Sequence, residues 1–228
     1  METVVITGAN RGIGLGLVRR YVRHGSRIFA CCRAPDQAEE LADLAQRENI
    51  TLVPLDVTDA AQVDAFVTGL GTQPIDILIN NAGVMGGTRQ SLSDMDYDAW
   101  REAFEINTIA PFRLTTALGQ HLASAPRPRV VTVSSQMGAL SRRSTGSHAY
   151  RSSKAAVNKV MQVLAVELEN DGIIVCPIHP GWVRTDMGGS HAEISVEESA
   201  EGIFNLISDF TIEQSGRFWT WNGEEHAW

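Results

Sequence analysis

The sequence has few cysteines and no long apolar run. Two of its three cysteines, Cys31 and Cys32, are adjacent and cannot easily bridge each other, and no cysteine spacing suggests zinc. No apolar run approaches the roughly 20 residues needed to cross a bilayer. The opening residues METVVITGAN lack the basic-then-apolar pattern of a signal peptide. We therefore expect a protein of the reducing cytoplasm, without structural disulfides, a metal site or a membrane partner.

The sequence also has fewer basic than acidic residues. The chain has 19 Lys and Arg against 27 Asp and Glu, which gives a formal net charge of −8. An acidic surface argues against nucleic acid or an anionic membrane as the main partner. A phosphate-bearing ligand would have to find local positive charge against this background, so individual arginines become informative.

Short apolar runs alternate with amphipathic stretches along all 228 residues. The runs are rich in Val and Ile and apolar nearly throughout, as strands of a parallel sheet covered on both faces are. The predicted strands are Val4–Thr7, Arg27–Cys32, Thr51–Leu55, Ile75–Ile79, Val130–Ser134, Ile173–Ile178 and Arg217–Trp221. The predicted helices start at Pro35 and at a capping box over Asp59–Gln62, and cover Tyr97–Leu122 and His148–Asn170. The pattern predicts an α/β fold: a single doubly wound Rossmann-type domain over 1–228 with a mainly parallel sheet of about seven strands.

A glycine-rich segment, TGANRGIG, follows the first predicted strand and opens the first helix. Its glycines are Gly8, Gly12 and Gly14. Glycine lets backbone N–H groups approach a pyrophosphate, and the helix N-terminus adds partial positive charge. A glycine-rich turn alone can be a tight connection, but this position favours a dinucleotide site. The spacing is T-G-x-x-x-G-x-G, which differs from the common G-x-G-x-x-G fingerprint.

Polar motifs also follow the fourth, fifth and sixth predicted strands. They are the NNAG segment from Asn80 to Gly83, the pair Ser134 and Ser135, and the PGWVRTD segment from Pro180 to Asp186. Each could be an ordinary turn, since Asn, Gly, Ser and Pro favour turns. The carboxyl ends of the strands, however, form the crevice in which α/β sheets bind ligands.

Tyr150 and Lys154 are four residues apart on a predicted helix and share one face. A free phenol has a pKa near 10, and a nearby ammonium lowers it. Such a pair suits the transfer of a proton to a developing alkoxide. Taken alone, the spacing is equally typical of a solvated helix face.

Together these motifs resemble the short-chain dehydrogenase/reductase family over essentially the whole chain. The resemblance implies an oxidoreductase that moves a hydride between nicotinamide and a carbonyl or alcohol. It implies that Tyr150 transfers the proton, that Lys154 lowers the Tyr150 pKa and holds the ribose, and that Ser135 polarises the substrate oxygen. It further implies that Asn107 distorts its helix and supports a proton relay. The expected cofactor-binding residues are Gly8, Asn10, Arg11, Gly12, Ile13, Gly14, Arg33, Asp56, Val57, Asn81, Ala82, Gly83, Tyr150, Lys154, Pro180, Gly181, Val183 and Thr185.

The second predicted strand indicates which nicotinamide cofactor is preferred. An acid at its end would pair with the ribose hydroxyls and repel a 2′-phosphate. Here the strand is followed by Arg33, and Asp36 comes only after Pro35. Arg33 can form a bidentate contact to the 2′-phosphate, and Arg11 can converge on it from the glycine loop. We therefore expect a preference for NADP(H), with NAD(H) as a second possibility.

The loop Leu140–Ser147 makes the interval from Ser135 to Tyr150 longer than in many family members. This loop and the Trp-rich end resemble the C-factor-like and carbonyl-reductase-like branch. Some C-factor-like proteins are linked to signalling, so a dinucleotide-binding regulator with little turnover stays an alternative. A sugar epimerase is disfavoured by the glycine spacing.

Residues 188–198 are expected to form a short lid over the substrate pocket, and pairing into a homodimer or homotetramer through the long helices is compatible with the family. Several aromatic and imidazole side chains are assigned no chemical role: His148, His179, Trp219, Trp221 and Trp228.

Overall fold

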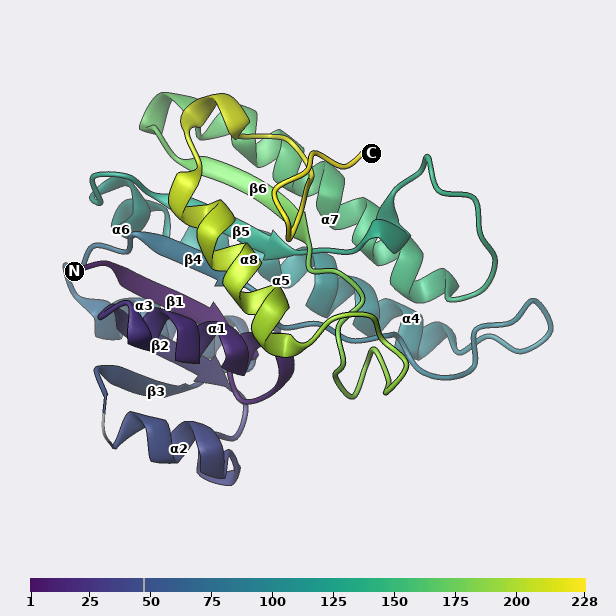
Figure 1. Cartoon of the computed structure of the whole chain (residues 1–228), viewed down its shortest axis with the longest axis horizontal. Coiled ribbons are helices and arrows are strands. Elements are labelled where there is room, and N and C mark those ends of the chain that lie inside the picture. Colours follow the sequence, from purple (N-terminus) through teal and green to yellow (C-terminus); the bar gives the residue numbers. More distant parts are fainter. Residues whose placement is uncertain (47) are drawn as a thin grey trace.

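The computed structural model describes residues 1–46 and 48–228. Within them, a seven-stranded sheet lies between two layers of helices (Figure 1). The strands are β1 (Thr3–Thr7), β2 (Arg27–Cys32), β3 (Ile50–Pro54), β4 (Ile77–Asn80), β5 (Arg129–Val133), β6 (Ile174–His179) and β7 (Trp219–Thr220). The helices are α1 (Gly12–Arg23), α2 (Glu39–Ala45), α3 (Ala60–Leu70), α4 (Tyr97–Phe104), α5 (Ala110–Ala117), α6 (Gly119–Ala123), α7 (His148–Glu167) and α8 (Val196–Asp209).

The strand order is β3-β2-β1-β4-β5-β6-β7, and every neighbouring pair is parallel. This confirms the predicted Rossmann-type fold. Strands β1 to β3 are added toward one edge of the sheet and β4 to β7 toward the other, so the strand order reverses between β1 and β4. This is the switch point where doubly wound sheets bind ligands. All seven predicted strands are present, with ends shifted by at most two residues.

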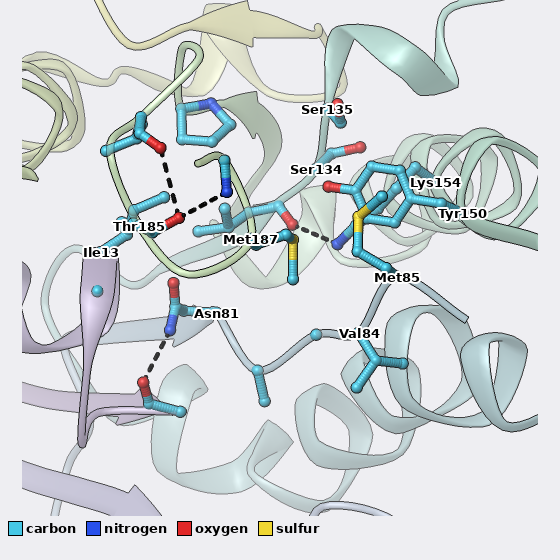
Figure 2. A pocket seen from close by; sticks show the side chains of 18 of the residues that line it. Ile13, Asn81, Val84, Met85, Ser134, Ser135, Tyr150, Lys154, Thr185 and Met187 are labelled. Carbon is cyan, nitrogen blue, oxygen red and sulfur yellow. Dashed lines mark hydrogen bonds between the residues drawn. The ribbon is translucent and has the colours of Figure 1, made fainter. Parts of the chain in front are cut away.

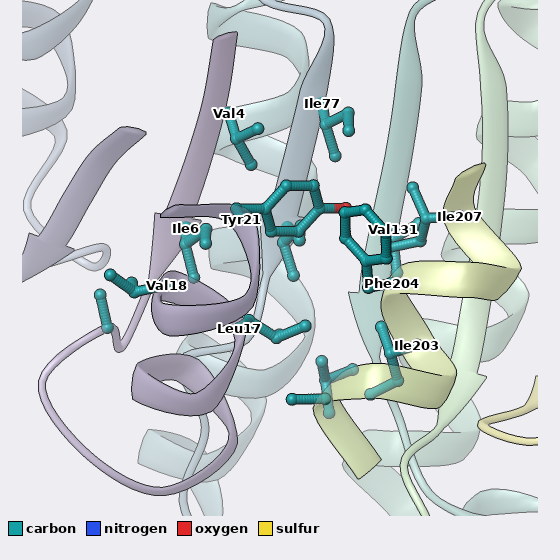
Figure 3. Packing of buried hydrophobic residues seen from close by; sticks show 14 of the residues in the cluster. Val4, Ile6, Leu17, Val18, Tyr21, Ile77, Val131, Ile203, Phe204 and Ile207 are labelled. Atoms are coloured by element: carbon teal, nitrogen blue, oxygen red, sulfur yellow. The ribbon is translucent and has the colours of Figure 1, made fainter. Parts of the chain in front are cut away.

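Helices α1 and α8 cover one face of the sheet (Figure 3). Tyr21 of α1 meets Phe204 of α8 edge-on, with ring centroids 4.9 Å apart. A Cβ at Gly16 would lie 2.6 Å from the Val196 side chain, so glycine lets the two helices approach closely. Helices α3, α5 and α7 bury Phe66, Leu114 and Val157 in the second core cluster, with alternate residues of the strands.

The predicted helix over Tyr97–Leu122 is interrupted. It divides into α4, a π-helical turn at Glu105–Ile109, α5 and α6. The π turn forms where the buried Asn107 side chain bonds to Val84 and Ser153, partners outside its own helix. The predicted helix over His148–Asn170 ends at Glu167, before a 3₁₀ turn and Gly172 with φ +69°. The helix expected from Pro35 is a 3₁₀ turn, and α2 begins only at Glu39.

The predicted capping box of α3 is half formed. The Asp59 carboxylate accepts hydrogen bonds from the backbone of Ala61 and Gln62, as an N-cap does. The Gln62 side chain, however, accepts from the backbone N–H of Asp56 rather than that of Asp59. The helix is thereby tied to the loop after β3. Among the described residues, no helix is long and apolar enough to span a membrane.

Candidate active site

A cavity of about 1040 Å³ extends along the carboxyl ends of the strands, lined by the loops that follow β1 to β6 (Figure 2). Of the predicted site residues, all but Gly14 and Asn107 line it. The sheet thus brings together segments from Gly8 to Thr185, as the position of each motif after a strand predicts. Gly14 and Asn107 lie behind the wall.

The glycine loop leaves one end of the cavity open to an anion. Gly8 and Gly12 have φ of +61° and +52°, the left-handed region that favours glycine. A Cβ at Gly14 would collide with the Gly8 carbonyl, which explains the third glycine as packing. The first turn of α1 carries no acid, and Arg11 at its N-cap makes no side-chain cap bond to a described residue. Backbone donors and the helix dipole therefore fit a pyrophosphate.

Asn81 braces this loop from the neighbouring strand. Its side-chain amide donates to the carbonyls of Thr7 (2.9 Å) and Gly8 (3.1 Å). In return, the Thr7 hydroxyl accepts from the backbone N–H of Asn81 and Ala82, both at 3.0 Å. The first sequence motif is thus joined to NNAG by four bonds. Thr7 was not among the predicted site residues, although its place directly before Gly8 was a usable signal.

Arg33 and Asp56 lie at the ends of neighbouring strands and line the cavity together. The Thr58 hydroxyl lowers the pKa of Asp56, and the charge of Arg33 adds to the effect. Arg11, in contrast, donates to Asp186 at 2.9 Å across the cavity. The expected convergence of Arg11 and Arg33 on a 2′-phosphate stays a prediction, and Asp186, 175 residues along the chain, would compete for Arg11.

Tyr150 and Lys154 of α7 face the cavity beside Ser135 (Figure 2). The Lys154 ammonium donates to the Val133 carbonyl at 2.8 Å and lies 5.7 Å from the centre of the Tyr150 ring. Burial lowers the pKa of Lys154 to about 8. Burial also raises the pKa of Tyr150, and the Ser135 hydroxyl only partly offsets this. The expected lowering of the Tyr150 pKa is thus reversed, because loss of hydration outweighs the neighbouring groups.

The two serines after β5 have different surroundings. The Ser134 hydroxyl donates a hydrogen bond to the Asn158 side chain at 2.5 Å, so this hydroxyl points into the protein interior. Ser135 accepts a bond from the Met137 backbone, and its hydroxyl lies beside that of Tyr150 in the cavity wall. This distinguishes the predicted Ser135 from its neighbour. Asn158 was not predicted, although it follows Lys154 by four residues on the same helix face.

Asn107 is fully buried and lies behind the cavity wall. Its side chain accepts from the Val84 N–H (2.9 Å) and donates to the Val84 carbonyl (2.8 Å) and to Ser153 (3.0 Å). A Cβ at Gly83 would lie 3.1 Å from the Asn107 oxygen and 3.5 Å from the Lys154 nitrogen. The glycine therefore leaves a small space between these two groups, as the predicted relay requires.

The segment after β6 folds over the cavity. Gly181 has φ +87°, and the Thr185 hydroxyl accepts from the Gly188 backbone at 3.1 Å. Arg184 and Ile194 then pair through the backbone, which closes the segment on itself. Helix α8 begins at Val196 after a capping box at Ser195. The lid expected over 188–198 therefore includes the first turn of α8, because Ser195 supplies an N-cap.

Comparison with known proteins fits this geometry. Residues 2–194 match the model of the short chain dehydrogenase family. The chain belongs to the short-chain dehydrogenases. It is 34% identical over 236 residues to the 1-hydroxy-2-glutathionyl-2-methyl-3-butene dehydrogenase of a Rhodococcus strain, over the full length of both chains. It is 40% identical over 165 residues to the C-signal of Myxococcus xanthus, covering 72% of this chain and 99% of that protein.

Solved structures resemble this short-chain dehydrogenase over its whole length. The NADPH-bound carbonyl reductase from chicken fatty liver has a TM-score of 0.94 and 33% identity, covering 100% of this chain and 99% of that one. A carbonyl reductase from Pseudomonas aeruginosa in complex with NADP has a TM-score of 0.89 and 35% identity, covering 100% of both chains.

The side chains that were assigned no chemical role mostly pack against other aromatic rings in this short-chain dehydrogenase. Trp219 packs in the core against Phe210. Trp228 stacks on Phe218, and His148 lies against Trp100. His179 differs from the others, because it lines the cavity at the end of β6. Its place at a strand end was the one feature of the sequence that indicated this position.

Proposed function

We propose that this short-chain dehydrogenase transfers a hydride between NADP(H) and a small carbonyl or alcohol substrate. One observation carries the proposal: Tyr150, Ser135 and Lys154 lie at one end of a cavity whose other end is the glycine loop and the open N-terminus of α1. The similarity to carbonyl reductases with NADPH or NADP bound supports the choice of cofactor and reaction.

The proposed cofactor site uses the cavity wall from both halves of the sheet. The backbone of the glycine loop would bind the pyrophosphate, Arg33 the 2′-phosphate, and Asp56 and Val57 the adenine end. NNAG, Lys154 and the PGWVRTD segment would hold the riboses and the nicotinamide. When bound, NADPH supplies the hydride.

In the proposed mechanism the chain's own residues position the substrate oxygen and transfer its proton. The Ser135 hydroxyl donates a hydrogen bond to that oxygen, and the Tyr150 hydroxyl gives or takes the proton. One donor of the Lys154 ammonium is used by Val133, so two remain for a ribose hydroxyl and the relay. Burial raises the pKa of Tyr150, and the Ser135 hydroxyl offsets part of this rise. The Lys154 ammonium would favour the phenolate further, because an opposite charge nearby stabilises the ionised form. Asn107 fixes Val84 and keeps the space beside Lys154 open.

The deciding experiment measures oxidation of NADPH and NADH by the pure protein with a panel of aldehydes, ketones and quinones. We expect NADPH to be preferred. In Arg33→Ala, NADPH binding should weaken about ten- to a hundredfold, because charge-assisted bonds to the phosphate are lost, while NADH binding is unchanged. Arg11→Ala is the matched comparison and should have a smaller effect, since Asp186 already holds that guanidinium. Parent preference for NADH, or equal loss of both cofactors in the Arg33 variant, would refute the assignment.

The similarity to C-signal keeps a regulatory role as the second candidate. In that case the protein would bind NADPH yet oxidise it with none of the carbonyls. The catalytic set of Asn107, Ser135, Tyr150 and Lys154 favours the enzyme, because a binding protein would not require it.

A further inference from the structure

The long loop Leu140–Ser147 borders the substrate end of the cavity. Arg142 and Ser144 from this loop line the same cavity as Ser135 and Tyr150. The Arg142 guanidinium donates to the side-chain oxygen of Gln136, a neutral group that also lines the cavity. Among the described residues, Arg142 forms no ion pair. A cation with most of its donors unused therefore lies near the proposed reaction centre.

The loop that carries Arg142 is anchored at several points. Arg151, the residue after Tyr150 in α7, donates to the Gly146 carbonyl (3.1 Å) and to the Ser144 hydroxyl (2.8 Å). The Ser141 backbone donates to the Trp228 carbonyl at 2.9 Å. An arginine held on an anchored loop loses less conformational entropy when it binds an anion than one on a free loop.

The positive charge of Arg142 acts on His179, which lines the same cavity at the end of β6. His179 is 8% exposed, and its Nδ1 has no hydrogen-bond partner in the described part of the chain. Burial lowers the pKa of His179 to about 4, and the charges of His226 and Arg142 contribute. No described carboxylate is among the charges that act on this imidazole. This end of the cavity therefore combines positive charge with an unpartnered polar atom.

The described carboxylates that line the cavity are Asp56, Glu102, Glu105, Asp186 and Glu193. Asp186 is bonded to Arg11, and Glu105 of the π turn is bonded to Arg113 at 2.8 Å. Glu102 is on α4 and Glu193 is on the segment before α8. None of them pairs with Arg142, so its positive charge is not neutralised where the substrate would lie.

We propose that the substrate is an aldehyde or ketone that also carries a carboxylate, and that Arg142 binds this carboxylate while the carbonyl oxygen lies at Ser135 and Tyr150. The proposal rests on the proposed function and specifies its substrate class. Arginine suits the role because its planar donors match a carboxylate.

The test compares two substrates with the same reacting group, para-formylbenzoate and its methyl ester. Reduction by NADPH is measured for the parent, for Arg142→Gln and for Arg143→Gln. Arg143 is the matched control, because it is the next residue, carries the same charge and is exposed. We expect the parent to favour the acid in kcat/KM by about ten- to a hundredfold, mainly through KM. Arg142→Gln should abolish this preference, Arg142→Lys should retain part of it, and Arg143→Gln should keep it.

Equal kcat/KM for acid and ester in the parent would overturn the proposal. Equal loss in the Arg142 and Arg143 variants would also overturn it, because it would indicate a general charge effect. A binding measurement separates this from the proposed function: para-(hydroxymethyl)benzoate and its methyl ester are titrated calorimetrically into the protein with NADP⁺. Selective binding of the acid that only the Arg142 variant loses, without turnover of any carbonyl, would keep the anion site and refute the oxidoreductase.

Discussion

Burial opposes ionisation of both proton-carrying side chains at the centre of this site. It lowers the pKa of Lys154 to about 8 and raises that of Tyr150. The Lys154 cation therefore exists at neutral pH at a cost in folding free energy, which the bond to the Val133 carbonyl partly offsets. Selection for stability alone would place an apolar residue here, so the lysine points to chemistry.

Tyr150→Phe keeps the ring and removes only the hydroxyl. We expect turnover to fall by a factor of about a hundred to ten thousand, because the proton donor is lost. NADPH binding should change little, since the phenol acts on the substrate oxygen. The measurements are steady-state kinetics and a fluorescence titration of NADPH. Turnover within a few-fold of the parent would contradict the assigned role.

The stability contribution of Lys154 should depend on pH. The amine has a pKa of about 8 in the folded chain and 10.5 as its ordinary value. Between these values the unfolded chain binds more protons, so the free energy of unfolding rises with pH. Lys154→Met should flatten this rise and increase the free energy of unfolding at pH 7 by up to about 3 kcal/mol, less the cost of the lost Val133 bond.

Urea unfolding at pH 7 and pH 10 checks this prediction. Lys159→Met on the same helix is the control, because Lys159 is exposed and should leave the pH dependence unchanged. Parallel pH curves for the parent and Lys154→Met would show that the lysine is not desolvated in the folded protein.

At the scale of elements, the sequence predicted the strands better than the helices. An unbroken apolar run such as that of β6 is specified locally by Val and Ile, so its position could be read directly. The break between α4 and α5 depends on bonds from Asn107 to Val84 and Ser153, which are 23 and 46 residues away in the sequence. Asn107 indicated a possible break, because Asn is unfavourable inside a helix, but the sequence does not show which residues it bonds to.

The difference between local patterns and long-range contacts also explains which site residues could be predicted from the sequence. Glycines, Tyr150 and Lys154 have short-range spacings that a sequence displays. Thr7, Asn158 and Arg142 act through partners from distant segments or through the shape of a loop, so only their contacts identify them. The pairing of Arg11 with Asp186, which is distant in the sequence, was likewise not predictable from local spacing.

Asn107→Ala should weaken the π turn and the wall behind Lys154. The change leaves the N–H and carbonyl of the half-buried Val84 without their partners, and an unpaired polar group of this kind costs about 1–3 kcal/mol when it is fully buried. We expect the free energy of unfolding to fall by about 2–4 kcal/mol and turnover to fall with it. Urea unfolding measures the first effect. Asn170→Ala, at an exposed position, should stay within about 0.5 kcal/mol of the parent.

At the scale of the whole molecule, the proposed cofactor site draws on both halves of the sheet. The glycine loop and Arg33 follow β1 and β2, whereas Ser135 and Thr185 follow β5 and β6. A ligand that contacts both halves binds the folded chain and not the unfolded one. Its binding free energy therefore adds to the stability of the complete domain.

NADPH should accordingly raise the melting temperature. At a hundred times its Kd the added stability is about 2.7 kcal/mol, which corresponds to roughly 5–10 °C for a chain of this length. NADH at the same concentration should give a smaller shift, and Arg33→Ala should make the two shifts equal. A scanning fluorescence melt measures all three, and the absence of any shift would contradict cofactor binding.

The contact between Arg11 and Asp186 has a consequence for the residence time of the cofactor. These side chains meet across the cavity, so we expect the ion pair to slow the departure of a bound dinucleotide. Both side chains are exposed, at 72% and 82%, so the pair contributes about 0.2–1 kcal/mol and is screened by added salt. NADP⁺ release should therefore accelerate with ionic strength, by no more than about fivefold. In Asp186→Asn, release should be faster at low salt and should depend less on ionic strength, because only the charged contacts to the phosphates remain to be screened.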